Sequence, residues 1–557
     1  MMEALSPANI GLLLFGIFFV LLLIGSPIMV ALGVATMACF IVLDIDLSLM
    51  IERAFASLTA FPLMALPAFV LAGSLMEAAG VSRRLVHVAE NIVGPTPGGL
   101  AISTTLSCVF FGAISGSGPA TTAAVGMLMI PAMAKRGYNV GYAAAATATA
   151  GGIGIIIPPS IPMVIYGVSG QQSISKMFMA GIIPGILIAI GLSVMHFFLC
   201  RNLKTEGLDW SMKTFIHSLR DGFWSILAPV IILGGIYAGI FTPTEAAVVA
   251  IFYTILVGIF IHKELTLKSF MASLKTTSWL TGRVLVLVFT ATAFGYLLTS
   301  YRIPVEIANW ILSFTNNVNL VWFFVVILLL FLGMFMETLA IIMLVTPVLL
   351  PIMTAYGVDP IHFGIILICC CGIGFSTPPL GENMFIASGI ANVSLEEISL
   401  KALPLVAINI AVIAILVMFP DIVLFLPNLM GTGLQSLPGG GALPPPSLHT
   451  SQSERRECYE LQNHRFLADG GVLPVRRLRF RRAAHDADDR HGRSRKLRNG
   501  RRGQCVQKIC GRQDQRRHPG CLHLRRLAGR RRRGTFPQGP EGHARHGPWR
   551  HRQHRAP

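Results

Sequence analysis

Residues 151–160 have the sequence GGIGIIIPPS, and residues 372–383 have the sequence GIGFSTPPLGEN. Each stretch interrupts an apolar segment with glycines followed by a proline pair. Inside a membrane every backbone N–H and C=O must be paired, so non-helical backbone persists only where protein buries it or where it lines a wet cavity. The two stretches therefore predict two broken membrane helices whose breaks lie inside the protein.

The sequence around these stretches is typical of a polytopic membrane protein. The chain has 557 residues, of which 53% are hydrophobic and 13% charged, whereas a soluble protein carries about 25% charged residues. Long runs such as 182–199 and 320–336 contain no Lys or Arg, and a span needs about 20 apolar residues. The run 10–43 is too long for one span and is interrupted at Gly25-Ser26-Pro27, so it predicts two elements. We expect ten to twelve membrane segments, the first of them permanent and not a removed signal peptide.

The body of the chain repeats itself in a register that pairs Pro131 with Pro351. In this repeat register residues 131–159 face residues 351–379, and eight of these 29 positions are identical, where chance would give about two. Most of the identities are glycines or prolines, which fix backbone shape. We therefore expect two related halves, 1–225 (with a polar connector) and 226–430, with the binding site between them, as in many secondary transporters. An odd number of spans in each half would make the second half inverted.

A second kind of break recurs in both halves as a hairpin of small polar residues. Residues 112–122 have the sequence GAISGSGPATT and face Met336-Glu337-Thr338 in the repeat register. Carbonyls freed by such breaks are hard oxygen ligands for a small cation such as Na⁺, and half-helix N-termini present N–H groups to a carboxylate. A single break of this kind is more often a packing kink. Two kinds at equivalent positions in both halves favour a binding site.

The charged residues of the body allow two interpretations. Glu337 lies within a predicted span, where an unpaired carboxylate is costly, so it predicts a functional site; the alternative is an interfacial or helix-capping role. Glu245 follows Thr242-Pro243 and is expected to cap a helix start. Arg283 and Arg302 flank an apolar run and are expected to extend to the membrane surface.

Four motifs carry a resemblance to a known family. They are GGIGIIIPPSIPMVIYG at 151–167, TPTEAA at 242–247, GVDPIHFG at 357–364 and GFSTPPLGENMFIASG at 374–389. Residues 1–430 resemble the large membrane subunit of tripartite ATP-independent periplasmic (TRAP) transporters. The resemblance implies an elevator-type fold in the bacterial inner membrane and sodium-driven uptake of a small organic acid: a dicarboxylate, a sialic acid, another sugar acid or a keto acid. It also implies a periplasmic binding protein and a small four-helix membrane subunit as partners, with no enzymatic activity and no cofactor besides the coupling ion.

The breaks and the resemblance together predict the site residues. The expected substrate ligands are Ser115, Ser117, Thr121, Ser160, Glu337 and Asn383. The expected sodium ligands are Ser115, Gly152, Ile155, Pro158, Glu337, Gly372, Phe375 and Pro378. Glu337 stands where relatives commonly have Asp. We expect Glu337 and the Ser115–Ser117 tip to face one shared cavity.

Residues 431–557 differ from the body. Residues 1–430 carry a net charge of −2 and residues 431–557 a net charge of +20, so the basic pI of 9.9 belongs to the tail and does not indicate nucleic-acid binding by the body. The tail is rich in Arg, Gly and Pro without hydrophobic periodicity, so we expect it to be disordered. An out-of-frame extension is favoured over an anionic-lipid binding tail.

Two other functions remain possible on the sequence alone. The broken segments could serve an ion channel, which would pass current without coupled uptake of an organic acid. An intramembrane enzyme is disfavoured because no Ser/His or paired Asp constellation lies in facing spans. The distribution of basic residues along the sequence does not fix the side on which the N-terminus lies.

Overall fold

A computed structural model describes residues 6–202, 211–378 and 381–434, and within these ranges the chain is helical, with no β-strand. Except for residues 431–434, which end the last helix, the predicted tail lies outside the described residues. The predicted boundary between the halves at 225/226 falls inside helix α11 (Met212–Tyr237).

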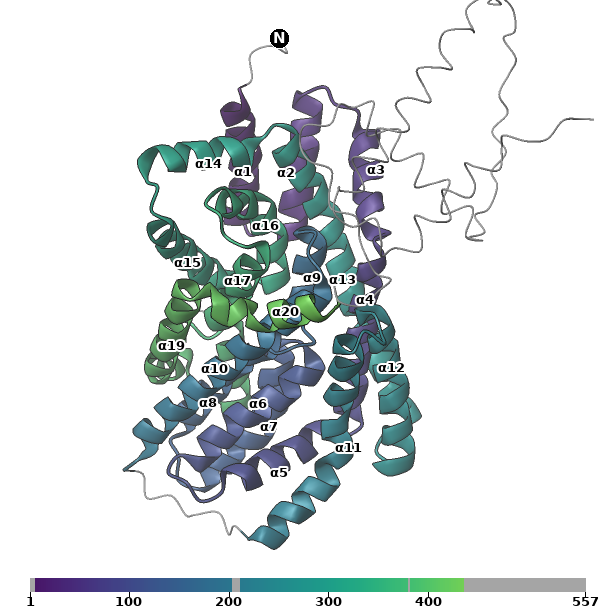
Figure 1. Cartoon of the computed structure of the whole chain (residues 1–557), viewed down its shortest axis with the longest axis vertical. Coiled ribbons are helices and arrows are strands. Elements are labelled where there is room, and N and C mark those ends of the chain that lie inside the picture. Colours follow the sequence, from purple (N-terminus) through teal and green to yellow (C-terminus); the bar gives the residue numbers. More distant parts are fainter. Residues whose placement is uncertain (1–5, 203–210, 379–380, 435–557) are drawn as a thin grey trace, which may run out of the picture. The chain divides into compact units, whose positions relative to one another are not determined.

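The first half of the described chain alternates long helices with short breaks (Figure 1). Its elements are α1 (Pro7–Leu23), α2 (Ile28–Val42), α3 (Leu47–Leu58), η1 (Phe61–Met64), α4 (Ala65–Ala78), α5 (Val81–Val93), α6 (Gly99–Ser115), α7 (Gly118–Lys135), α8 (Val140–Gly151), η2 (Gly152–Ile155), α9 (Ile161–Ser169) and α10 (Ile174–Cys200). The predicted interruption at Gly25-Ser26-Pro27 is confirmed, because it separates α1 from α2.

The second half follows the same order. Its elements are α11, α12 (Pro243–Leu256), η3 (Val257–Ile261), α13 (Leu267–Ser300), α14 (Ile303–Phe314), α15 (Val318–Phe335), α16 (Thr338–Ala355), α17 (Pro360–Gly374), α18 (Glu382–Ala391), α19 (Leu395–Met418) and α20 (Pro420–Leu434). The predicted cap of α12 is confirmed, because Glu245 Oε2 accepts from the backbone N–H of Thr242 at 2.8 Å.

The repeat register is visible in the helices themselves. Helices α7 and α16 are both 18 residues long, and the register pairs their first residues, as it pairs those of α8 and α17. A hydrogen bond recurs in the same register: Tyr142 Oη lies 2.6 Å from His196 Nδ1, and His362 Nε2 lies 2.9 Å from the carbonyl of Leu416. The predicted structural repeat is therefore confirmed.

The two halves exchange contacts in a reciprocal way. Helix α9 of the first half packs against α16, and its counterpart α18 packs against α7; likewise α8 packs against α19, and α17 against α10. Reciprocal pairs of this kind are what an approximate two-fold axis produces. Figure 1 shows α6, α7 and α8 in its lower part and α15, α16 and α17 in its upper part, so the hairpins enter from opposite ends, as in an inverted repeat.

Fewer helices reach spanning length than the apolar runs suggest. Within the described residues, eight helical segments are long and apolar enough to cross a membrane, against the ten to twelve expected. The difference arises because several apolar helices fall short of spanning length: α1, α2 and α6 have 15–17 residues, and α8 and α17 end at the predicted breaks. Every residue of α8 and α17 after the first is buried, which places the two breaks at the centre of the helix bundle.

Candidate functional site

The first break lies between α8 and α9 and is held by its own serine. After α8 the chain makes the short 3-10 turn η2 and then an extended stretch that ends at Ser160, the N-cap of α9. The Ser160 hydroxyl donates to the carbonyl of Ile155 at 2.5 Å, and the side chain is fully buried. One lone pair of a predicted sodium ligand, the Ile155 carbonyl, is thus occupied by Ser160.

The first hairpin tip, Ser115–Ser117, packs against this break. Gly116 adopts a φ of +60°, and its carbonyl accepts from the N–H of Ile161 at 3.3 Å. Ser115 Oγ lies 2.9 Å from Thr121 Oγ1, which also donates to the carbonyl of Ser117 at 2.7 Å. The Ser115 and Thr121 hydroxyls thus form one cluster with the backbone carbonyl of Ser117 at the start of α7, and Ser160 lies against it across the Gly116 contact.

The second break lies between α17 and α18. Its described residues end at Pro378 and resume at Gly381; Pro379 and Leu380 lie outside them. The carbonyl of Phe375 accepts from the N–H of Asn383 at 3.1 Å, and the Phe375 ring packs against Gly118 at the start of α7. The first hairpin therefore contacts both breaks.

The two breaks meet at a pair of equivalent glycines. A Cβ placed on Gly372 would lie 2.8 Å from the carbonyl oxygen of Gly152, and a Cβ on Gly152 would clash with the carbonyl oxygen of Gly372. The repeat register pairs these two residues, and two residues related by a two-fold axis touch each other only where they lie close to that axis. Gly152 and Gly372, both predicted sodium ligands, thus mark the symmetry centre of the site.

Buried oxygens without a hydrogen-bond partner lie next to this centre. The amide nitrogen of Asn383 donates to the carbonyl of Ala148 at 3.1 Å, and Asn383 Oδ1 has no partner among the described residues. Thr122 Oγ1 likewise has none within the described chain, and both side chains lie against Gly151. A buried oxygen without a donor costs free energy unless water or an ion reaches it. Because no group of three His, Cys, Asp or Glu suited to a metal occurs in the described residues, a cation held here would rely on such neutral oxygens.

Glu337 is the N-cap residue of α16, as Ser117 is of α7. Its carboxylate receives a hydrogen bond of 2.6 Å from Arg283 Nη2 on α13, and its side chain is 28% exposed. Glu382, at the start of α18, interacts electrostatically with both Glu337 and Arg283. Arg283, expected to extend to the membrane surface, instead neutralises the intramembrane carboxylate.

The second hairpin reaches the centre one turn away from Glu337. Gly333 packs against Gly374, so both hairpins contact the second break, the first at Phe375 and the second at Gly374. The structure thus connects the Ser117 and Glu337 tips through two adjacent residues. A single cavity shared by the two tips stays a prediction.

Three side chains that border the predicted site were not among the predicted ligands: Arg283, Glu382 and Thr122. For Arg283 the available signal was the lone carboxylate itself, which needed a cation within reach. Glu382 and Thr122 stand inside the quoted motifs and were overlooked.

Comparison with known proteins identifies a family over most of the body. The family described as "Tripartite ATP-independent periplasmic transporter, DctM component" matches residues 15–422. The isethionate TRAP transporter permease protein DctMQ of Oleidesulfovibrio alaskensis is 45% identical over 74% of this chain, and the chain spans 65% of that relative's length. The C4-dicarboxylate TRAP transporter large permease protein DctM of Rhodobacter capsulatus is 33% identical over 76% of this chain and 99% of its own. The sialic acid TRAP transporter large permease protein SiaM of Vibrio cholerae is 38% identical over 66% of this chain and 87% of its own.

Two solved transporters share the fold at low sequence identity. The YdaH transporter of Alcanivorax borkumensis superimposes with a TM-score of 0.51 at 16% identity, covering 67% of this chain and 88% of its own. MtrF of Neisseria gonorrhoeae superimposes with a TM-score of 0.50 at 13% identity, covering 74% of this chain and 97% of its own. These likenesses concern the fold alone, and the elevator-type motion stays a prediction.

Proposed function

This chain belongs to the DctM component family of tripartite ATP-independent periplasmic transporters, and on that premise we propose that it imports a small organic anion together with sodium. It is the large permease subunit of a TRAP transporter, a multi-pass protein of the inner membrane. The observation that carries the proposal is the meeting of two broken helices at Gly152 and Gly372, beside buried oxygens that lack partners.

Sodium coupling follows from the kind of ligand the centre offers. The unpartnered atoms Thr122 Oγ1 and Asn383 Oδ1 are neutral hard oxygens, which suit a weakly bound monovalent cation. The freed carbonyls of the two breaks supply further oxygens of the same type. We assign the carbonyls of Gly152, Gly372 and Phe375 to the cation, because Gly152 follows Gly151, against which both side chains lie, and Phe375 accepts from the N–H of Asn383. Glu337 balances the charge of Arg283, so that this guanidinium does not oppose the sodium ion.

The substrate is proposed to bind at the hairpin tips. Helices α7 and α9 begin directly after their N-caps Ser117 and Ser160, and both N-termini present N–H groups to an anion. The Ser117 hydroxyl adds a further donor, whereas the Ser160 hydroxyl already donates to Ile155. The named relatives transport isethionate, C4-dicarboxylate and sialic acid, which are all organic anions. A compact carboxylate or sulfonate is therefore the proposed substrate class.

The partners and the motion are proposed from the family. A periplasmic binding protein delivers the anion, and a small membrane subunit supports the helices outside the hairpin cluster. The hairpins with α8–α10 and α17–α19 move as one body along α13, whose 34 residues make it the longest helix of the described chain. No feature of the described residues favours the alternative function, an ion channel.

Uptake into vesicles tests the proposal. The full chain is reconstituted with its small subunit and loaded binding protein, and radiolabelled isethionate, succinate and sialic acid are offered separately under an inward sodium or potassium gradient. We expect one anion to accumulate only under the sodium gradient. Equal uptake in potassium, or sodium-driven current without uptake of any organic anion, would overturn sodium-coupled import.

A further inference from the structure

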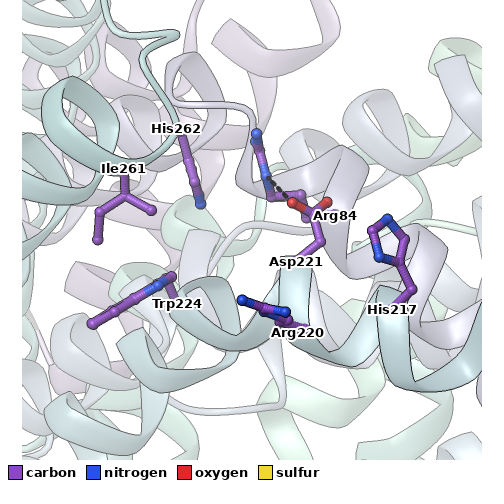
Figure 2. A pocket seen from close by; sticks show the side chains of 7 residues that line it. All are labelled: Arg84, His217, Arg220, Asp221, Trp224, Ile261 and His262. Carbon is purple, nitrogen blue, oxygen red and sulfur yellow. Dashed lines mark ion pairs between the residues drawn. The ribbon is translucent and has the colours of Figure 1, made fainter.

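A second polar pocket lies away from the hairpin site, at the junction of α5, α11 and the turn between η3 and α13. It has a volume of about 290 Å³, and Figure 2 shows the side chains of Arg84, Arg220, His217, His262 and Asp221 around it. Four of these five side chains are basic or imidazole groups. None of the predicted substrate or sodium ligands lines this pocket.

Two hydrogen bonds hold the Arg84 guanidinium in this pocket, and its Nε–H makes none within the described residues. Its Nη2 donates to Glu264 Oε1 at 2.9 Å and its Nη1 to the carbonyl of Gly80 at 3.0 Å. Its Nε lies 3.6 Å from Asp221 Oδ1, too far for a hydrogen bond, and has no other acceptor among the described residues although the atom is buried. The Nε–H therefore faces the Asp221 carboxylate without a hydrogen bond to it, and it can still donate to an oxygen acceptor such as a phosphate oxygen.

His262 presents a hydrogen-bond acceptor to the same pocket. Its Nδ1 lies 2.9 Å from the carbonyl of Ala79, and because a carbonyl can only accept, Nδ1 carries the proton. Burial lowers the pKa of His262, so the ring is neutral near pH 7 and its Nε2 is an acceptor. Nε2 is buried and has no partner in the described part of the chain. Within the described residues the pocket thus provides neither a hydrogen-bond acceptor for Arg84 Nε nor a donor for His262 Nε2.

An apolar surface continues directly from this pocket. A second cavity of about 360 Å³ is lined by Ile216, Leu219, Phe223, Trp224 and Arg220, so it shares Arg220 and Trp224 with the first. Phe223 and Ile216 are 50% and 58% exposed. A ligand that fills both cavities would have a polar head and an apolar chain, with Trp224 at the boundary, where aromatic side chains favour the membrane interface.

The pocket lies at the more basic end of the described chain. Gly98 contacts Cys200, and α5 packs against α11, so the ends of α5 and α10 and the start of α11 lie together. This end carries Arg83, Arg84, Arg201, Lys213, Arg220 and Lys263, against the acidic Glu90, Asp221 and Glu264. The opposite end, where Tyr356 donates to the carbonyl of Thr315, carries Asp359. By the positive-inside rule the basic end faces the cytoplasm, whose leaflet holds anionic lipids.

We propose that this pocket binds the headgroup of an anionic, hydroxyl-bearing phospholipid of the phosphatidylglycerol class, with an acyl chain on the exposed face of α11. The phosphate accepts from Arg84 Nε and pairs with Arg220. A headgroup hydroxyl donates to His262 Nε2. The bound lipid links α5 to α11 and to the η3–α13 turn, which Arg84 already joins through Asp221 and Glu264.

Lipid titration of the purified full chain tests the site. The protein is delipidated in detergent, and binding is followed by native mass spectrometry and by the midpoint of thermal unfolding. The probes are phosphatidylglycerol, phosphatidylmethanol (anionic, no hydroxyl), phosphatidylcholine and chain-free glycerol 3-phosphate. We expect phosphatidylglycerol to bind most tightly, phosphatidylmethanol more weakly, and the other two not at all.

Variants locate the binding. Arg220 is exposed, and its side chain has no hydrogen bond or ion pair within the described residues, so Arg220→Gln should fold and weaken phosphatidylglycerol binding by about five-fold, the effect of one interfacial basic residue. Lys135→Gln removes an exposed charge outside the pocket and should leave binding unchanged. His262→Phe should abolish the preference for phosphatidylglycerol over phosphatidylmethanol.

Three results would overturn the proposal. Equal weakening by Arg220→Gln and Lys135→Gln would show that only overall charge attracts the lipid. Protection by glycerol 3-phosphate as strong as that by phosphatidylglycerol would identify a soluble phosphate ligand. If a crosslinker on Phe223→Cys captured the small membrane subunit in native membranes, and phosphatidylglycerol did not compete, the face would be a protein interface.

Discussion

The two hairpin tips occupy equivalent positions and differ in chemistry. The repeat register pairs Ser117 with Glu337, and each is the N-cap of a helix of 18 residues. The first tip is closed by hydrogen bonds among hydroxyls, with no charge. The second carries a carboxylate that depends on Arg283, a residue outside the hairpin. Symmetry thus fixes where the tips lie, and the side chains decide what each tip can bind.

The largest effect on uptake is expected at the second hairpin tip, which carries Glu337. Glu337→Gln leaves Arg283 without its counter-charge and should lower sodium-dependent uptake by more than about ten-fold, since an uncompensated positive charge close to the site opposes sodium binding. Glu306→Gln on α14 is the matched control and should have no effect. Uptake is measured in vesicles and folding by gel filtration.

A double variant separates structure from coupling at that tip. Glu337→Gln with Arg283→Gln removes both charges and should recover folding stability without recovering uptake. If the double variant transported normally, the ion pair would be only a structural replacement for the hydroxyl cluster of the first tip. The difference between the tips would then carry no function.

The next largest effect, on stability and uptake, is expected at Gly152 and Gly372, the equivalent glycines at which the two halves meet. A methyl group on Gly152 or on Gly372 would meet the backbone of the other, so each Gly→Ala variant should lower the free energy of unfolding by about 1–3 kcal/mol and reduce uptake. Gly234→Ala on α11, where a Cβ meets nothing within 4 Å, is the control. Unfolding in detergent should show similar losses for both site variants; a loss at only one of them would mean that the axis lies elsewhere.

A smaller effect is expected at the neutral tip. Ser117→Ala removes the cap of α7 and one hydroxyl, so it should cost about 1 kcal/mol of stability and raise the substrate concentration for half-maximal uptake several-fold. Ser117→Thr keeps the helix cap and the hydroxyl, so its stability and its substrate concentration for half-maximal uptake should equal those of the parent chain. Sodium dependence, measured by varying external sodium, should not change; a shift as large as that of Glu337→Gln would make the tips functionally equal.

The sequence predicts the backbone of this site better than its electrostatics. Glycines and prolines act locally, so the breaks at 151–160 and 372–383 and the turn at Gly116 follow from composition and register. Ion pairs depend on which helices lie side by side. Arg283 and Glu337 are 54 residues apart, and Arg84 and Glu264 are 180 apart, so neither pair has a local pattern.

A comparison of the two halves for identical residues does not find every equivalent interaction. Tyr142 and His362 are equivalent positions with different residues, yet each donates or accepts a hydrogen bond to the equivalent helix, at His196 and at Leu416. Sequence comparison in the repeat register finds the glycines and prolines that match and passes over such substitutions. Packing preserves the contact while the residues change.

The smallest effect is expected at this pair of equivalent contacts. Tyr142→Phe removes the hydrogen bond to His196, and His362→Phe removes the one to the Leu416 carbonyl; each should lower the free energy of unfolding by about 1 kcal/mol. Because each bond joins the helix before a break to the second helix after it, α8 to α10 and α17 to α19, their losses should be similar. Neither variant should change sodium dependence, since both side chains lie at the far ends of α8 and α17 from Gly152 and Gly372. Chemical unfolding in detergent and uptake at varied sodium measure the two quantities. A change in sodium dependence in either variant would show that these contacts serve coupling, and that the functional difference between the halves extends beyond the hairpin tips.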